Sequence, residues 1–385
     1  MEIKIETKTF KKLMKDMGIA IGSKPTISTL ESVKIVATEE NIIFTTSDID
    51  LTLVKTVLTG DKVFVNEPGS ILMPFRLSSN IINKLSGKTI TVQTKSDTEA
   101  HIKSGKSKFK ISVLSADMFP TIPETNADDK SLTFATDDFA TVIKKVSHAA
   151  STQESRPTLT GLHFSTSQVT NGDQEENVLS VEATDTHVMA KVTTDINTDG
   201  IEWDAIIPAK PLTKISSILE ENNEVEIQFT PNQGQITFNL GQNRILLRLI
   251  EGNYPDTSRI IPPISDDCTI KLKRKDVLDT FGRATIIAKT AKSLVSLLEI
   301  KDDKLTVSSN SPSTGDMHEE LSFEPVSSTV KELKIGMNPH YIIQTVSQIT
   351  SDNVILSFNN SLRPFRVVNP EDDNYIQIIT PIRLA

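Results

Sequence analysis

The side chains that could carry chemistry are thinly spread along this chain. Its six histidines, at 101, 148, 163, 187, 318 and 340, lie at least fifteen residues apart. Zinc ligands on one helix face stand about four residues apart, so no histidine pair fits. The fifteen glycines never occur as Gly-x-Gly, and neither a dinucleotide fingerprint nor a P-loop can be written. We therefore expect no metal site and no cofactor.

A catalytic dyad could be built only from Asp185-Thr186-His187. No serine in a Gly-x-Ser-x-Gly elbow and no second acid at a telling spacing accompanies it. Cys268 follows two aspartates, which raise the pKa of a thiol and disfavour a nucleophile. We expect no catalytic activity. The alternative left open is an enzyme centred on Asp185 and His187, whose turnover His187→Ala would remove.

Composition restricts the class of protein. The 385 residues, 37% hydrophobic, predict several globular domains. Forty-one Lys and Arg against fifty Asp and Glu give a net charge of -9, which disfavours nucleic-acid binding by bulk electrostatics but leaves a local basic surface possible. The single cysteine suits a reducing compartment. Neither a signal core nor an apolar run of ~18 residues occurs. We expect a cytoplasmic protein that does not enter the membrane.

The elements that position these residues recur along the chain. Three helical stretches share one pattern: FKKLMKDM from Phe10, FATVIKKV from Phe139 and VLDTFGRA from Val277. Strand patterns follow them at 42–50, 179–187 and 305–311. The tetrapeptide Lys24-Pro25-Thr26-Ile27 returns as Arg156-Pro157-Thr158-Leu159, although the third copy lacks it. Such self-similarity is typical of a duplicated unit.

Each copy contains a second, similar half. A short strand, a turn and a helix are predicted for 71–85, 205–219 and 334–346. Alternating strands follow at 89–92, 224–229 and 353–358. The segments 123–130 and 255–267 read as linkers. The sequence thus predicts an α+β fold of three domains, 1–126, 127–262 and 263–385, each made of two helix-plus-antiparallel-sheet units.

Charge is unevenly divided between helices and the rest. The six predicted helices are 8–18, 76–87, 138–148, 209–221, 276–289 and 339–350. They hold twelve Lys and Arg against six Asp and Glu, so they carry +6 and the remainder carries -15. This division indicates a basic surface that meets a polyanion. The alternative is that exposed helix positions simply favour lysine.

Five strings carry a family resemblance: SRPTLTGLHF (155–164), ATDTHVMA (183–190), EGNYPDTSRIIP (251–262), LRPF (362–365) and YIQIITPIRLA at the end. In this order, over nearly the whole chain, they resemble the bacterial DNA polymerase III beta subunit, or sliding clamp, family. The resemblance implies a head-to-tail homodimer, a ring of DNA-clamp domains with helices lining the pore. It implies a non-catalytic processivity factor that encircles double-stranded DNA and tethers the replicative DNA polymerase, the clamp loader and repair proteins.

Helix dimensions are compatible with such a ring. Twelve helices side by side at ~10 Å spacing form a circle ~38 Å across, with a hole near ~28 Å. A duplex roughly 20 Å wide passes through it. Six helices would leave only about 9 Å, so one chain could not encircle DNA.

The resemblance assigns three sets of residues. DNA-contacting positions are Lys24 and Gln153, with Lys106 and Lys108 where the family often has basic residues; the helix lysines Lys11, Lys12, Lys15, Lys144 and Lys145 join them through the charge argument. For any single lysine, an ordinary charged surface explains it nearly as well. The apolar ring joint takes Phe109, Ile111, Ile286 and Ile287. A monomeric scaffold that binds the same partners remains the second alternative, and Phe109→Asp would leave its mass unchanged.

The third set is a groove between domains two and three, into which partner proteins insert a short peptide with an apolar end. The resemblance places there Leu159, Thr184, His187, Met189, Pro255, Arg259, Ile260, Asn338, Tyr341, Leu362, Pro364, Pro381, Ile382 and Arg383. Apolar walls with a few polar handles suit a peptide anchor, while residues such as Leu159 and Ile260 could equally be core. Val188-Met189 and Thr380 depart from the family pattern, so peptide preference can differ from that of relatives; Ala385 is an extra terminal residue.

Overall fold

The computed structural model describes residues 1–22, 27–122, 131–171, 174–198, 201–219, 224–230, 234–264, 267–290, 294–301, 303–328 and 332–384. Its internal contacts divide the chain into two units. Unit 1 contains Met1–Phe139 and Lys210–Leu249, and unit 2 contains Ala140–Ala209 and Ile250–Ala385. The middle third of the chain therefore contributes to both units.

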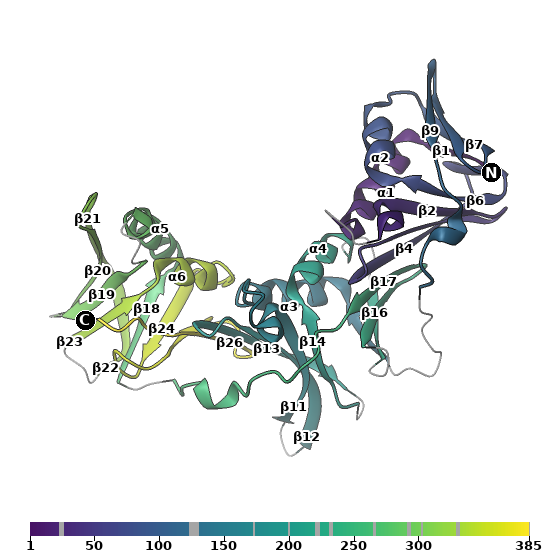
Figure 1. Ribbon diagram of the computed structural model, residues 1–385. Helices are drawn as coiled ribbons and strands as arrows, with labels where there is room; N and C mark the ends of the chain where they lie inside the picture. Colours follow the sequence, from purple (N-terminus) through teal and green to yellow (C-terminus); the bar gives the residue numbers. More distant parts are fainter. Residues whose placement is uncertain are drawn as a thin grey trace. The chain divides into compact units, whose positions relative to one another are not determined.

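Unit 1 contains two antiparallel sheets among its described residues (Figure 1). The first has the order β5 (Val63–Glu67), β1 (Glu2–Glu6), β7 (Thr89–Ser96), β8 (Glu99–Ser104) and β9 (Ser107–Ser112). The second has the order β10 (Ser131–Ala135), β15 (Glu224–Thr230), β16 (Gln235–Leu240), β17 (Asn243–Arg248), β4 (Leu51–Leu58), β3 (Asn41–Ser47), β2 (Ser32–Ala37) and β6 (Gly69–Pro74).

Helix α1 (Thr7–Met17) shows why these segments fold as they do. Its buried side chains are Phe10, Leu13, Met14 and Met17, the spacing of one helix face. Phe10 packs against Phe44 of β3, with ring centroids 6.2 Å apart. Helix α2 (Phe75–Lys84) begins directly after Pro74 and contacts α1. The lysines of α1 are left on its opposite face.

Unit 2 likewise contains two antiparallel sheets in its described part (Figure 1). The larger has the order β14 (Asp204–Pro208), β11 (Gly161–Asn171), β12 (Gln174–Thr184), β13 (Val188–Asn197), β26 (Tyr375–Ile379), β25 (Phe365–Val368), β24 (Asn353–Phe358), β18 (Cys268–Lys273) and β22 (Phe323–Ser328). The smaller has the order β21 (Gly315–Leu321), β20 (Lys304–Ser311), β19 (Ser296–Lys301) and β23 (Glu332–Met337).

Helices α5 (Arg274–Thr290) and α6 (Pro339–Val346) pack together in unit 2, over a core that includes Phe281, Phe358 and Phe365. Helices α3 (Thr136–Ser147) and α4 (Ala209–Leu219) cross the division between the units. No helix in the described ranges is long and apolar enough to cross a membrane.

The strand pairing confirms the internal repeat. The first strand of each copy pairs with the strand that follows the second helix, as β1·β7, β10·β15 and β18·β24. All six predicted helices are present and begin within two residues of their expected starts. The predicted strand 353–358 matches β24. The strand expected at 179–187 ends instead at Thr184, because residues 185–187 form a turn.

Two features differ from the sequence interpretation. Neighbouring copies do not have separate sheets, because β17 pairs with β4 and β13 pairs with β26, so each junction is one continuous sheet. The second expected linker, 255–267, is partly fixed, since the buried Thr257 donates a hydrogen bond to Glu182 at 2.6 Å. The first, 123–130, lies outside the described residues.

Candidate functional site

All fourteen residues expected to line the peptide groove fall within unit 2. Thr184 and His187 of this predicted groove lie at the turn between β12 and β13. Thr186 has φ +81°, which is unusual for a β-branched residue and costs about 1–3 kcal/mol. The Asp185 carboxylate holds the turn by accepting hydrogen bonds from the backbone N–H groups of His187 and Val188, both at 2.8 Å. The Thr184 hydroxyl accepts one from the Thr186 N–H.

An aromatic pair stands above this turn. The His187 ring stacks on Tyr341 of α6, with centroids 5.9 Å apart and planes 19° apart. Burial and the negative charge of Asp185, which accepts a hydrogen bond from the Tyr341 hydroxyl, raise the pKa of that phenol. Asn338 caps α6 by accepting a hydrogen bond from the His340 N–H at 3.0 Å. Asp185 thus organises both the backbone of the turn and the Tyr341 side chain.

The C-terminal segment forms a second wall. The Thr380 N–H donates to the His187 carbonyl at 2.8 Å, and the Ile382 N–H donates to the Gly336 carbonyl at 2.7 Å. A Cβ at Gly336 would lie 2.7 Å from the Ile382 carbonyl oxygen. Only glycine therefore lets the segment approach β23 this closely. Gly336 was not predicted as a site residue, because nothing local to that glycine indicates the distant segment that covers it.

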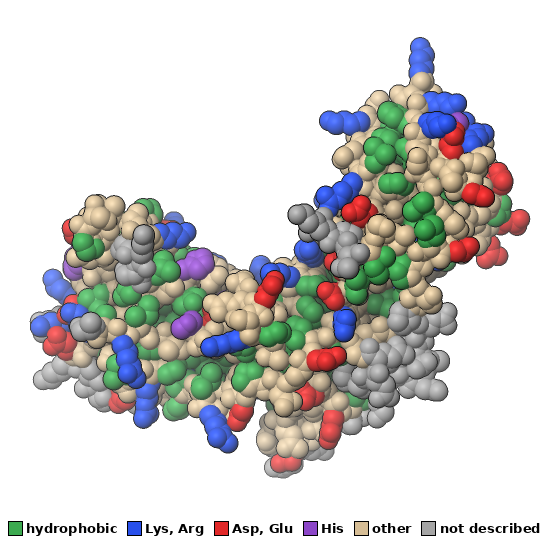
Figure 2. All heavy atoms as spheres, in the orientation of Figure 1, with side chains coloured by type: hydrophobic (Ala, Val, Ile, Leu, Met, Phe, Trp, Pro, Cys, Tyr) green, Lys and Arg blue, Asp and Glu red, His purple; other side chains and the backbone are tan. Residues whose placement is uncertain are grey.

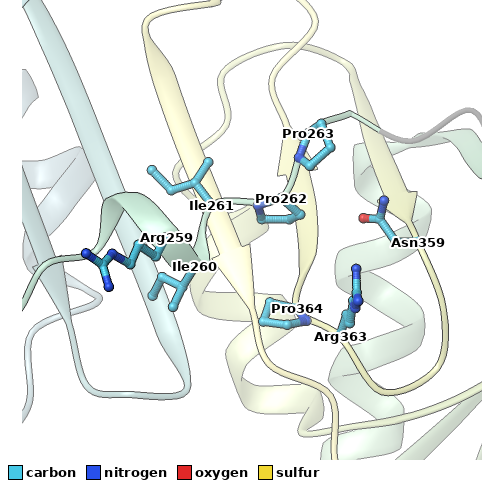
Figure 3. Close-up of a pocket in the computed structure, with 8 residues that line it drawn as sticks. All are labelled: Arg259, Ile260, Ile261, Pro262, Pro263, Asn359, Arg363 and Pro364. Carbon is cyan, nitrogen blue, oxygen red and sulfur yellow. The ribbon is translucent and has the colours of Figure 1, made fainter.

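Pro255, Arg259 and Ile260 lie on the linker, and Leu362 and Pro364 lie on the loop between β24 and β25. Ile260 is 46% exposed, which favours a surface role over the core alternative, and Leu362 is exposed as well. A groove brings Arg259, Ile260 and Pro364 together (Figure 3). Pro255 and Arg383 are exposed, whereas Leu159, Met189 and Pro381 are buried and can only support the groove from below. For Leu159 the core alternative is the better description.

We expect Asp185→Ala to lower the free energy of unfolding by about 2 kcal/mol, because two hydrogen bonds from backbone N–H groups to a carboxylate are lost. It should also weaken capture of an apolar-ended peptide, because His187 and Tyr341 lose their support. The repeat supplies a matched control: Asp48 holds the equivalent turn of unit 1 through the Leu51 N–H at 2.8 Å. Urea unfolding and peptide titration should show that Asp48→Ala costs stability alone. Equal loss of peptide binding in both variants would contradict the assignment.

The predicted DNA-contacting residues are not brought into one cluster by the described structure of either unit. Lys12, Lys15, Lys106, Lys108, Lys144 and Gln153 are exposed, and Lys11 is half-buried. Lys24 lies outside the described residues. Lys145 forms an ion pair with Asp372 at 2.5 Å and lies 5.4 Å from the centroid of the Tyr375 ring. The ammonium group of Lys145 is therefore already paired, a use that the sequence could not reveal because its partner is 227 residues away.

The four residues expected at the ring joint differ in how exposed their side chains are. Phe109 on β9 is 39% exposed and Ile286 on α5 is 66% exposed, so both are available to a partner. Ile287 is half-buried. Ile111 is only 4% exposed and packs in the core of its own unit. Its place at the joint stays a prediction.

Comparisons with known proteins agree over the whole chain. The family models for the N-terminal, central and C-terminal domains of the DNA polymerase III beta subunit match residues 1–123, 133–256 and 258–383. The beta sliding clamp of Bacillus subtilis strain 168 is 31% identical over 377 residues, covering 96% of both chains. That of Staphylococcus aureus strain Mu50 is 32% identical over 388 residues, covering 100% of this chain and 99% of the other.

Solved structures agree. The beta chain of DNA polymerase III from Streptococcus pneumoniae TIGR4 has a TM-score of 0.90 at 29% identity, and the DNA polymerase sliding clamp of Bacillus subtilis has 0.88 at 30%. Both matches cover 100% of both chains. The turn, the aromatic pair and the C-terminal wall thus lie in a chain with three beta-subunit domains in tandem. The chain belongs to the DNA polymerase III beta subunit family.

Proposed function

We propose that this chain is a DNA sliding clamp, a non-catalytic processivity factor that closes around duplex DNA as a head-to-tail dimer. It tethers the replicative polymerase, and the clamp loader and repair proteins reach it through the same peptide groove. Its place is the cytoplasm, where a bacterial replication protein meets its DNA. The main support for a closed ring is a pair of edge strands, β9 and β21, that can pair with each other between two copies of the chain.

The two junctions within the chain use one register. At β17·β4, Ile245 lies opposite Leu53. At β26·β13, Gln377 lies opposite Ala190. The equivalence of the two junctions follows from the strand registers. When directly opposite residues are traced from strand to strand within each repeat, Ile245 and Gln377 occupy the same position in their repeats, and so do Leu53 and Ala190. A repeat therefore joins its neighbour in a fixed way.

The first and third repeats each have an edge strand that is equivalent to a junction strand. In the described structure, each of these edge strands is paired on one side only. In the first repeat, the residue equivalent to Ile245 is Phe109 on β9, the last strand of its sheet. In the third repeat, the residue equivalent to Leu53 is Met317 on β21, again a terminal strand. An open edge is a template for pairing with another chain. β9 of one copy is thus suited to β21 of a second copy, with Phe109 opposite Met317.

Charge supports this pairing. The β8–β9 hairpin carries Lys106, Lys108 and Lys110, and Figure 2 shows basic side chains gathered at the end of the sheet that contains β7 and β9. Strand β21 carries Asp316, Glu319 and Glu320. The inferred register sets Lys110 opposite Asp316. Opposite charges that face each other across strands favour this pairing and disfavour β9 with β9.

A heterologous joint that closes after two copies makes a ring. Two copies supply the twelve helices that the helix-packing estimate requires for a duplex. Retention then depends on enclosure, while weak phosphate contacts from exposed lysines such as Lys15 and Lys144 let the ring move along DNA. An acidic body with basic helices fits this use.

The test is retention on DNA circles. Protein loaded on a nicked circle should co-elute with the DNA in gel filtration and be lost when the circle is cut once, because a ring slides off an end. A circle of the same length, cut before loading, is the control. Equal loss from cut and uncut circles would contradict enclosure. A monomeric mass in sedimentation would favour the scaffold alternative.

A further inference from the structure

A groove of about 390 Å³ extends the predicted peptide site (Figure 3). Residues 259–263 of the linker form one side, and Asn359, Arg363 and Pro364 of the β24–β25 loop form the other. Both sides belong to unit 2. We call this the flank groove, because it shares Arg259, Ile260 and Pro364 with the predicted peptide site and continues beyond it.

The walls of the flank groove are apolar and rigid. Ile260, Ile261, Pro262, Pro263 and Pro364 supply them. Prolines have a fixed φ and no N–H group, so little entropy is lost when a ligand packs on them. The three prolines also offer no backbone donors. We therefore look to the polar side chains at the two ends for polar recognition.

Arg363 supplies the unused charge. Its backbone N–H is held by the Asn360 carboxamide at 2.9 Å, which fixes the loop. The exposed guanidinium makes no ion pair or hydrogen bond with another described residue, and in Figure 3 it extends on the same side as Asn359. The Asn359 side-chain oxygen is buried without a hydrogen-bond partner in the described structure. This end of the groove thus carries an unpaired cation beside an amide oxygen that can accept a hydrogen bond.

The opposite end is already neutralised. Arg259 forms an exposed ion pair with Asp256 at 3.3 Å, and Figure 3 shows its side chain directed away from the prolines. Among the described lining residues, Arg363 is one free cation beside an apolar wall, which suits a single carboxylate next to an apolar side chain. Duplex DNA would need several cations in a row, and the described lining does not supply them.

We propose that the flank groove binds an acidic flank of the partner peptide, whose carboxylate pairs with the Arg363 guanidinium while a neighbouring side chain packs on Ile260 and Pro364. This inference rests on the proposed function, because it concerns the same peptide. It goes further by naming Arg363 as a specificity residue and an acidic flank as the preferred chemistry. Planar guanidinium–carboxylate pairing gives this contact direction as well as strength.

The experiment uses the full chain and three fluorescein-labelled peptides with one apolar end made of leucine and phenylalanine. One peptide has no flank, one has a Glu-Glu flank and one has a Gln-Gln flank. Fluorescence anisotropy at low salt should show about fivefold tighter binding of the Glu-Glu peptide than of the Gln-Gln peptide, as one exposed ion pair gives. Arg363→Gln should remove this difference, and Arg363→Lys should keep part of it.

Lys304→Gln, an equal charge change on β20, is the matched control and should keep the whole difference. Equal binding of the Glu-Glu and Gln-Gln peptides, or a difference that survives Arg363→Gln, would overturn the inference. Weakened duplex binding with unchanged peptide preference in Arg363→Gln would assign the arginine to phosphate and also overturn it. Failure of all three peptides to bind would count instead against peptide capture itself, so the two failures are distinguishable.

Discussion

In oxidising buffer, a chain that carries Phe109→Cys and Met317→Cys is expected to cross-link into a dimer closed at both joints. Residues directly opposite in an antiparallel pair have Cβ atoms about 5 Å apart, close to the separation that a disulfide requires. The native Cys268 is buried, and burial with the nearby Asp267 charge raises the pKa of its thiol. It should therefore not compete for oxidation.

The measurement is whether the cross-linked ring stays on circular DNA after every non-covalent contact has been removed. A ring closed by two disulfides on a plasmid should remain with the DNA in denaturing detergent and be released either by reductant or by one cut in the plasmid. Nearly all loaded protein should behave in this way, whereas the unmodified protein should be stripped completely. This separates enclosure from adhesion, because detergent removes every non-covalent contact.

A cysteine at the residue next to Phe109 tests the register inferred for β9 and β21. In Lys108→Cys with Met317→Cys, the first cysteine points to the opposite face of the sheet, since successive side chains alternate. This pair should stay unlinked under the same conditions. Preferential linking of the Lys108 pair would show that the count from the internal junctions does not extend to the joint between copies.

Much of the fold was predictable because its signals are local. The apolar face of α1 and the alternation in β24 are written in short stretches of sequence, and both elements were placed within a residue or two. The sheets shared between repeats were not predicted. Val54 pairs with Arg244, and no local pattern in β4 indicates a partner so far along the chain. The sequence interpretation therefore gave each repeat its own core.

The candidate site divides in the same way. His187 and Tyr341 were predicted from the resemblance, and the structure stacks them. The role of Asp185 could have been inferred, because an Asp between two strands often caps a turn through its carboxylate. Two other contacts depend on partners far along the chain: Lys145 with Asp372, and Gly336 with Ile382. Only the three-dimensional structure reveals these.

The Gly336–Ile382 contact leads to the second large effect. Gly336→Val should weaken capture of an apolar-ended peptide at least about thirtyfold while leaving the fold intact. Any Cβ at this position meets the Ile382 carbonyl oxygen at 2.7 Å and a Leu384 methyl group at 2.8 Å. Backbone cannot yield by a rotamer change, so the C-terminal segment must leave β23 and carry Pro381 and Ile382 away from the groove. Loss of such anchors typically costs at least 2 kcal/mol, or about thirtyfold in affinity.

Gly282→Ala is the matched control, because the residue is inside helix α5 and a Cβ built there meets nothing within 4 Å beyond its chain neighbours and the backbone of its own helix. It should stabilise the chain by up to ~1 kcal/mol and leave peptide affinity unchanged. Thermal unfolding should remain cooperative in both variants, and sedimentation should show the same assembly, because β9 and β21 are untouched.

A Gly336→Val chain that retains full affinity would mean that the C-terminal segment is not part of the groove. A chain that loses affinity only by unfolding would be recognised by its melting curve, and the milder Gly336→Ala would then decide, since its single methyl group already meets the same carbonyl oxygen.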